Sequence, residues 1–125
     1  MDKRIGRVLG CALGLVVVAR GAPGAEDPRD VRRIEITASR FEFVPPQIEA
    51  RRGETVELVV RSADTEHGLA IKAFGVKMTV PKGGAAVTAR FVADRAGRFP
   101  FVCSEWCGSG HRRMRGELVV TEATQ

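Results

Sequence analysis

The sequence is poor in the side chains that carry most protein chemistry. Its 125 residues include two histidines, three cysteines, three methionines and one tryptophan, and no tyrosine. We find no nucleophile paired with a general base, so catalysis by this chain alone is not expected. The longest apolar run, residues 8–19, has twelve residues, whereas a membrane-spanning helix needs about 20. The run is therefore too short to cross a bilayer comfortably.

Residues 1–25 have the order of segments that is typical of a secretory signal peptide. A short basic segment comes first, the apolar run follows, and small residues lie between that run and Ala25. We expect cleavage near Gly24 or Ala25, removal of Cys11 with the signal, and a periplasmic or otherwise exported protein with no membrane span after signal removal. An uncleaved membrane anchor is the alternative interpretation.

The net charge gives no support for a nucleic-acid-binding role. The whole chain has 20 basic and 15 acidic residues, a net charge of +5. Removal of residues 1–25 takes away four basic residues and one acidic residue, which leaves 16 and 14 and a net charge of +2. A nucleic-acid-binding domain usually carries a larger basic excess concentrated on one face, so no nucleic-acid partner is expected.

Residues 34–122 are dominated by short segments in which apolar and polar residues alternate. This period of two, with β-branched residues and frequent turn residues, predicts seven or eight short strands and an all-β sandwich or barrel. No segment has a helical pattern, and the charged residues 26–33 are predicted to form a flexible leader. The predicted strands are residues 34–43, 55–60, 69–74, 76–80, 85–93, 96–102 and 116–120.

After signal removal, six histidine, cysteine and methionine residues remain, and five of them fall into one pattern. Four lie in the segment 103–114, which reads CSEWCGSGHRRM, and the fifth lies in an upstream loop. In a β-sandwich, loops that are distant in sequence can meet at one end of the sheets. The five candidate metal ligands are His67, Cys103, Cys107, His111 and Met114.

Thiolate, imidazole and thioether groups together form a soft ligand set that favours copper. Zinc accepts two cysteines and two histidines but has little use for the methionine. In an exported protein, Cys103 and Cys107 could instead form a short disulfide in a metal-free interaction module. The residue types alone leave these alternatives open, and Met114 weighs toward copper.

The segment CSEWCGSGHRRM resembles the binding loop of the dinuclear copper (CuA) domain of cytochrome c oxidase subunit II, whose pattern is C-x-E-x-C-G-x-x-H-x-x-M. Residues 64–83, DTEHGLAIKAFGVKMTVPKG, resemble that family's histidine strand, and residues 41–60 resemble its first strands more loosely. The resemblance covers roughly residues 36–121. It implies a cupredoxin-like Greek-key sandwich or barrel over residues 34–122, and an exported, soluble protein that carries single electrons.

By this resemblance, the two cysteines of the segment would bridge two copper ions through their sulfurs. His67 and Met114 would complete the coordination of one ion, and His111 and the backbone carbonyl of Glu105 that of the other. The expected partner is a redox protein such as a cytochrome c or a terminal oxidase or reductase, and a copper chaperone is a further expected partner. The alternative function is binding and delivery of copper during assembly of a respiratory copper enzyme.

Two features of the sequence depart from oxidase subunit II. That family has two transmembrane helices before its copper domain, and an aromatic patch, including a tryptophan, where cytochrome c delivers its electron. This chain has neither an apolar run long enough for such helices nor a tryptophan upstream of the motif. These differences argue against an ordinary oxidase subunit and leave the redox partner open.

The residues around the candidate ligands allow more than one interpretation. Trp106 is either an exposed docking and electron-uptake surface or a cover for the copper loop. The arginines at positions 112, 113 and 115 are either solvated charges or a docking site for an acidic partner. The side chain of Glu105 is either solvated or, as in oxidases, directed to a further metal at a subunit interface.

Overall fold

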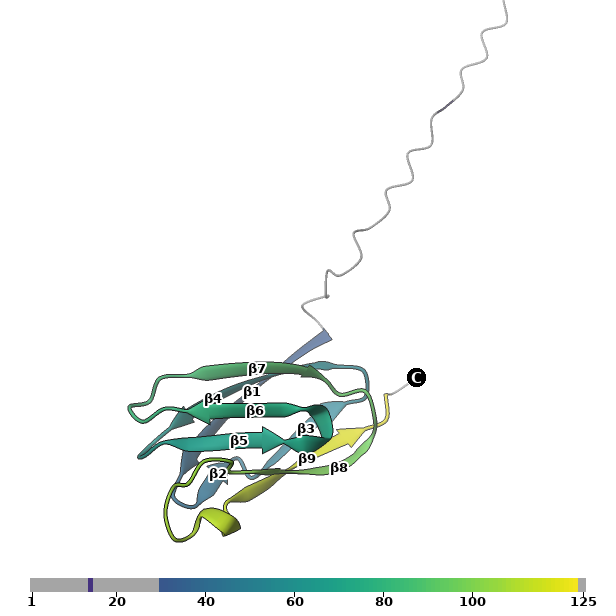
Figure 1. Cartoon of the computed structure of the whole chain (residues 1–125). Coiled ribbons are helices and arrows are strands. Elements are labelled where there is room, and N and C mark those ends of the chain that lie inside the picture. Colours follow the sequence, from purple (N-terminus) through teal and green to yellow (C-terminus); the bar gives the residue numbers. More distant parts are fainter. Residues whose placement is uncertain (1–13, 15–29, 124–125) are drawn as a thin grey trace, which may run out of the picture.

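The computed structural model describes residue 14 and residues 30–123 of the chain, so the predicted signal peptide (residues 1–25) lies outside the described residues except for Gly14. The described residues form nine strands in two sheets (Figure 1). The predicted all-β class is confirmed, with nine strands in place of seven or eight. The strands are β1 (Val31–Ser39), β2 (Glu42–Val44), β3 (Gln47–Arg51), β4 (Thr55–Ser62), β5 (His67–Ile71), β6 (Val76–Val80), β7 (Val87–Val92), β8 (Gly97–Val102) and β9 (Arg115–Thr121).

The first predicted strand, residues 34–43, is divided between two strands. The chain reverses after Ser39, and β2 pairs antiparallel with the end of β1. A further strand that the sequence pattern does not predict, β3, follows two consecutive prolines and pairs in parallel with β9. Its alternation buries only Ile48 and Ala50, which is too short a pattern to be recognised beside prolines.

β1 begins earlier than the sequence predicts. Its first residue is Val31, so the last three residues of the predicted flexible leader (26–33) belong to the strand. They pair in parallel with β4, and the exposed Arg33 guanidinium lies 3.3 Å from the Glu57 carboxylate. Strand pairing therefore orders a segment whose charged composition is typical of a loose chain.

The two sheets have the strand orders β2-β1-β4-β7 and β3-β9-β8-β5-β6. Their apolar faces form one core, in which the rings of Phe43 and Phe101 pack edge to face with centroids 5.2 Å apart. Burial of each large apolar side chain contributes about 1.5–3 kcal/mol, so this core is the main source of a rigid scaffold. Other fully buried core residues are Ile36, Leu58, Leu69, Ile71 and Leu118.

The strands run between two ends of the sandwich. The segment 103–114 joins β8 to β9 at one end, where His67 also lies at the start of β5; we call this the cysteine end. β1 begins and β9 finishes at the opposite end, the far end, where Val31 pairs with Thr55. Figure 1 shows the segment 103–114 as a yellow-green loop and turn that project from the sheets.

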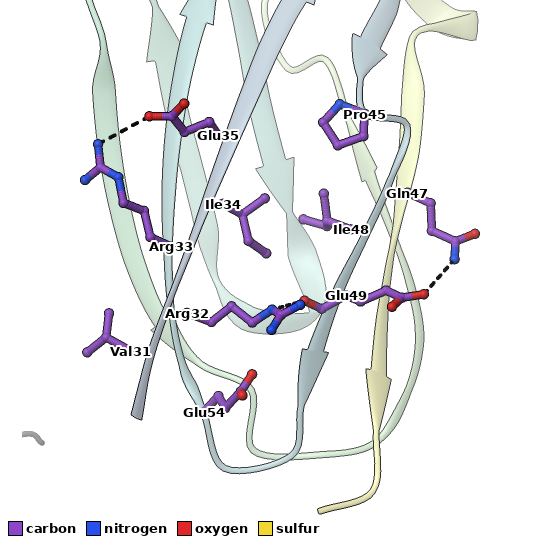
Figure 2. Close-up of a pocket in the computed structure, with 10 residues that line it drawn as sticks. All are labelled: Val31, Arg32, Arg33, Ile34, Glu35, Pro45, Gln47, Ile48, Glu49 and Glu54. Atoms are coloured by element: carbon purple, nitrogen blue, oxygen red, sulfur yellow. Dashed lines mark hydrogen bonds and ion pairs between the residues drawn. The ribbon is translucent and has the colours of Figure 1, made fainter. Parts of the chain in front are cut away.

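A groove of about 730 Å³ lies between β1 and β3 (Figure 2). Ile34 and Ile48 lie between the two strands, and Arg32 Nε donates a hydrogen bond to the Glu49 carbonyl, 2.8 Å away. Because β2 covers only the end of β1, the first part of β1 is an open edge, and its charged residues discourage pairing with other strands. No cysteine or histidine lines this groove, so it is separate from the candidate metal ligands.

The helices in the described part of the chain are two 3₁₀ turns, η2 (Lys72–Phe74) and η3 (His111–Arg113). Among residues 30–123, no helix has the length and apolar character that crossing a membrane requires.

Candidate metal centre

The five predicted donor side chains are brought together at the cysteine end. His67 is fully buried at the start of β5. The segment 103–114 forms a closed loop, because the Cys103 amide donates to the Met114 carbonyl, 3.1 Å away. Within this loop, η3 places His111 beside Cys107. The two cysteines and the methionine are buried, and His111 is half-buried.

Two glycines allow the loop to approach the sheets closely. A Cβ atom on Gly68, next to His67 in β5, would lie 2.2 Å from Ser104 Oγ and 2.8 Å from the Glu105 amide nitrogen. A Cβ atom on Gly110 would lie 2.3 Å from the ring of Phe41. All three separations are shorter than real Cβ contacts. A larger residue at Gly68 or Gly110 would therefore force the loop or its neighbours to move.

The donor atoms cluster around two sulfur atoms. The sulfurs of Cys103 and Cys107 lie 3.6 Å apart. His67 Nδ1 lies 4.0 Å from the sulfur of Cys103, and Met114 Sδ lies 3.8 Å from the sulfur of Cys107. The histidine and the methionine therefore flank the sulfur pair together, each beside a different sulfur.

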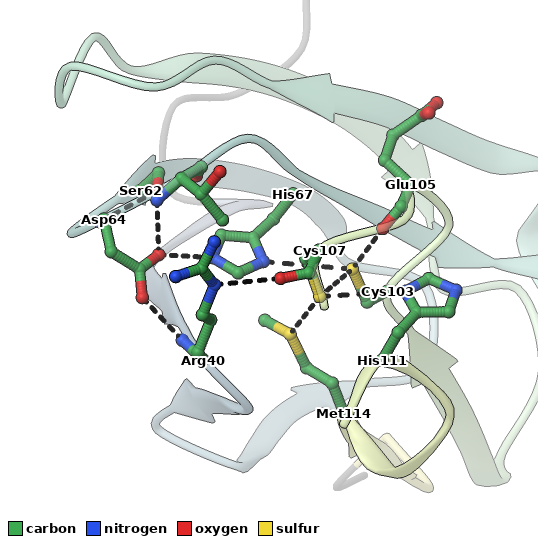
Figure 3. Close-up of polar contacts among 10 residues, drawn as sticks. Arg40, Ser62, Asp64, His67, Cys103, Glu105, Cys107, His111 and Met114 are labelled. Carbon is green, nitrogen blue, oxygen red and sulfur yellow. Dashed lines mark hydrogen bonds and ion pairs between the residues drawn. The ribbon is translucent and has the colours of Figure 1, made fainter. Parts of the chain in front are cut away.

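A second pair of donors flanks the same two sulfurs. The carbonyl oxygen of Glu105 lies 3.1 Å from the sulfur of Cys103, and His111 Nδ1 lies 3.7 Å from the sulfur of Cys107. Figure 3 shows this pair on one side of the sulfurs and the histidine–methionine pair on the other. Each side thus offers one donor next to each sulfur.

These separations fit metal ligands and are too long for a disulfide. A disulfide holds its sulfurs about 2.05 Å apart, whereas these sulfurs are 3.6 Å apart and both cysteines are free. Ligands about 2.0–2.3 Å from a tetrahedral metal lie about 3.3–3.8 Å from one another. The donor atoms of His67, Cys103 and Cys107 all lie within 4.8 Å of one another. The soft donor set favours copper.

The Cys107 thiol of the metal-free site is held in its protonated form. Burial raises the pKa of the Cys107 thiol to about 11, and the hydrogen bond and charge of Cys103 raise it further in the same direction. Metals bind the thiolate, and a cation between the sulfurs would lower this pKa. Metal uptake by the site therefore displaces the Cys107 thiol proton.

A carboxylate behind His67 fixes the orientation of its ring. Asp64 Oδ1 lies 2.6 Å from His67 Nε2, and Asp64 Oδ2 accepts a hydrogen bond from the Arg40 amide, 2.8 Å away. Burial acts to raise the pKa of Asp64, but hydrogen bonds from the Arg40 amide, the His67 ring and the Thr65 amide outweigh burial and lower it to about 2. The ionised carboxylate assigns the proton of His67 to Nε2 and leaves Nδ1 facing the sulfurs.

Arg40 connects this carboxylate to the cysteine loop. Its backbone amide binds Asp64, and its side-chain Nε donates to the Cys107 carbonyl, 2.9 Å away. Neither Arg40 nor Asp64 is predicted to be a site residue from the sequence pattern. A carboxylate three positions before a candidate ligand histidine is a usable signal. No such signal exists for Arg40, which lies 67 positions from Cys107.

Residues of the cysteine loop that are not among the five donor side chains lie at the rim of the cluster. Trp106 is 74% exposed, and its ring centroid lies 5.7 Å from that of His111. The Glu105 carboxylate points away from the sulfurs in Figure 3 and accepts a hydrogen bond from the Thr79 hydroxyl, 3.4 Å away. The Ser104 hydroxyl is buried without a hydrogen-bond partner in the described residues.

Comparison with known proteins identifies the family of the chain. The profile of a family described as "Cupredoxin-like domain" matches residues 10–120. Cytochrome c oxidase subunit 2 from Thermus thermophilus is 29% identical over 89 residues, which are 71% of this chain and 65% of that protein. Nitrous-oxide reductase from Cupriavidus necator is 32% identical over 92 residues, which are 70% of this chain and 14% of that protein. The chain spans less than two thirds of the length of these curated relatives.

The fold is also that of a solved domain of subunit II of cytochrome oxidase. The periplasmic domain of subunit II of cytochrome oxidase from Bradyrhizobium japonicum superposes with a TM-score of 0.66 and 23% sequence identity. The superposition covers 72% of this chain and 83% of that domain. At this identity the likeness establishes the shared sandwich.

Proposed function

Because the chain belongs to the Cupredoxin-like domain family, we propose that it is an exported CuA-type copper protein that carries single electrons between respiratory redox partners. Its sequence resembles cytochrome c oxidase subunit 2. The observation that carries the proposal is the pair of free sulfurs 3.6 Å apart with one donor beside each sulfur on either side. A single metal would use only one of these two sides, whereas two metals would use both.

The proposed ligand set follows these two sides. The two cysteines would bridge both copper ions, His67 and Met114 would complete one, and His111 and the Glu105 carbonyl would complete the other. Copper would supply a reversible one-electron couple at this position. With every ligand position filled by the protein, no open position is left for a substrate, and we propose that the chain is not itself an enzyme.

The protein's own contribution would be to hold these donors still. The ring of His67 is fixed by Asp64, and the amide of Cys103 is fixed to the Met114 carbonyl. Donors locked by packing and by hydrogen bonds move little when the charge of the centre changes. A centre that moves little exchanges electrons at a low reorganisation cost.

The second candidate function is copper delivery during assembly of a respiratory enzyme. Delivery requires ligands that a recipient protein can reach. The exposed fractions here are 5% for Cys103, 4% for Cys107 and 1% for Met114, which favours a carrier that retains its copper. The proposed partner is a redox protein such as a cytochrome c or a terminal oxidase or reductase, with a copper chaperone that loads the site. The proposed location of this chain is the periplasm or another compartment outside the cytoplasm.

Copper titration of the reduced protein tests the proposal. We expect a species with two copper ions per chain and, by electron paramagnetic resonance, one unpaired electron shared over two nuclei. Cys107→Ser should abolish this species, whereas Ser109→Ala, an exposed change in the same loop, should retain it. A full dicopper spectrum in Cys107→Ser would contradict the proposed dinuclear copper centre. A single bound copper that passes readily to moderate chelators would favour delivery.

A further inference from the structure

Three exposed arginines on and beside η3 carry charges that are not neutralised in residues 30–123. The side chains of Arg112, Arg113 and Arg115 make no ion pair or hydrogen bond with the described residues; we call these three the basic rim. Several other exposed arginines are paired with carboxylates: Arg33 and Arg90 with Glu57, Arg52 with Glu122 and Arg98 with Glu117. The positive charge of the rim is therefore available to a partner.

An exposed aromatic ring lies beside this rim. Trp106 is 74% exposed, more than Val44 or Val92, the other large apolar residues exposed in the described chain. Its ring centroid lies 5.7 Å from that of His111, a residue of the proposed copper ligand set. Tryptophan is enriched in the central contacts of protein interfaces, and here it leads from the surface directly to a proposed ligand.

The acidic groups of the cysteine end lie outside the basic rim. The Glu105 carboxylate is turned away from the sulfurs and bound to Thr79, and Asp64 is occupied by His67 and the Arg40 amide. Two further exposed acids lie outside the segment 103–114: Glu42 is in strand β2, and Glu66 is in the loop before β5. The rim itself contains three positive charges within four residues.

We propose that Trp106 and the basic rim form the docking surface for an acidic one-electron carrier protein. This inference rests on the proposed function and identifies the partner by its chemistry: carboxylates that surround the exposed edge of a redox cofactor. In the forward step, the partner's reduced centre loses one electron and is oxidised, and the copper centre gains that electron and is reduced. No atom or proton is transferred, and the reverse step is the same exchange run backwards.

The fluorescence of Trp106 tests the charge of this surface without copper. Since Trp106 is the only tryptophan and tyrosine is absent, emission from the reduced, copper-free protein reports on this surface alone. All quenching is expressed relative to that of free N-acetyltryptophanamide by the same ion; on this scale we expect iodide to quench Trp106 at least about threefold more efficiently than caesium, with the preference lost at about 0.5 M salt. Neutral acrylamide reports the accessibility of the ring. Equal quenching by the two ions, or a preference for caesium, would overturn the proposal.

Matched variants identify the source of the charge. Replacement of Arg112, Arg113 and Arg115 by glutamine should remove the preference for iodide. Replacement of three paired arginines elsewhere by glutamine, with the same loss of charge, should retain it: Arg33, Arg52 and Arg98. Circular dichroism establishes that each variant is folded. Preference for iodide that persists in the folded rim variant, or disappears only in the control, would contradict the proposal.

Electron exchange tests docking in the copper-loaded protein. Oxidation of the reduced protein by anionic ferricyanide should slow about tenfold in the rim variant at low ionic strength and less than about twofold in the control. Oxidation by cationic tris(phenanthroline)cobalt(III) should not slow. An acidic cytochrome should exchange faster than a basic one, and the reverse order would overturn the proposal. A blue shift of Trp106 emission on vesicles of phosphatidylglycerol would assign the surface to a membrane instead. If the protein takes up no copper, the proposed function fails while the quenching result stands.

Discussion

Asp64 lies behind His67 on the side away from the cysteine sulfurs, with its Oδ1 atom 2.6 Å from His67 Nε2. The contact occupies the ring nitrogen that faces away from the sulfurs and leaves Nδ1 directed at Cys103. The backbone amide of Arg40 holds the second carboxylate oxygen. Asp64 is thus a positioning residue, because it determines how His67 is presented.

Removal of this carboxylate should weaken metal binding without removing a ligand. Partners that orient a ligand histidine typically account for about 10–100-fold in metal affinity, so we expect a loss of that size in Asp64→Ala and a smaller loss in Asp64→Asn, whose amide oxygen still accepts a hydrogen bond. Competition with a chelator measures the affinity. Glu66→Ala, an exposed neighbour, should bind copper as the parent protein does. Parent-like affinity in Asp64→Ala would show that packing alone orients His67.

Met78 provides a matched control for a test of Met114 as the thioether ligand. Met114 Sδ lies 3.8 Å from the sulfur of Cys107, whereas Met78 packs against the core outside the cluster. Exchange of methionine for leucine conserves volume and usually costs less than about 1.5 kcal/mol. Met114→Leu should change the visible spectrum and the reduction potential of the copper-loaded protein, and Met78→Leu should change neither. Identical spectra for the two variants would make Met114 a core residue only.

The close approach of Gly68 to the cysteine loop should be sensitive to one added methyl group. Because its Cβ atom would lie 2.2 Å from Ser104 Oγ, Gly68→Ala should destabilise the protein by about 1–3 kcal/mol and lower copper affinity. Chemical denaturation measures the first effect and chelator competition the second.

Ser104→Ala provides the control for this clash. Its buried hydroxyl has no hydrogen-bond partner in the described residues, so its removal alone should be neutral or slightly stabilising. In the double variant, the loss from Gly68→Ala should be partly recovered, because one of the two short contacts disappears. Strictly additive effects would indicate that Gly68 and Ser104 are not in contact.

The side chain of Arg40 should stabilise the cysteine loop from outside the ligand set. Arg40→Ala removes the bond from Nε to the Cys107 carbonyl but keeps the backbone amide that binds Asp64. We expect a loss of about 1–2 kcal/mol in the free energy of unfolding of the metal-free protein. Arg61→Ala, which removes a longer bond to the Gly84 carbonyl at 3.5 Å, should cost less. An equal loss in both variants would argue against a specific tie to the loop.

The candidate ligands could be predicted from sequence because their residue types are rare and four of them are close together. A histidine in a chain with only two is conspicuous, and so are a cysteine and a methionine at fixed spacing from it. The alternating strands were equally readable, since alternation places Val56, Leu58 and Val60 in the core. These features depend on local pattern, which a single sequence contains.

The features that could not be predicted depend on contacts between distant residues. Arg40 reaches Cys107 across 67 positions, and nothing near either residue signals that contact. β3 is recognisable as a strand only through its parallel pairing with β9. Residues 31–33 look like part of a charged leader, yet pairing with β4 makes them a strand. In each case tertiary pairing decided what local composition left open.

The positions at which β1 starts and β9 stops determine where the domain could be attached to an electrode or to another protein. β1 starts at Val31 and β9 stops at Thr121, both at the far end, while the donor cluster and Trp106 lie at the cysteine end. A linker to an electrode or to another protein that is attached at the start of β1 or the end of β9 would join the domain at the far end. It would leave the donor cluster and Trp106 facing solution. The points of attachment thus lie at the far end, and the proposed site of electron exchange lies at the cysteine end.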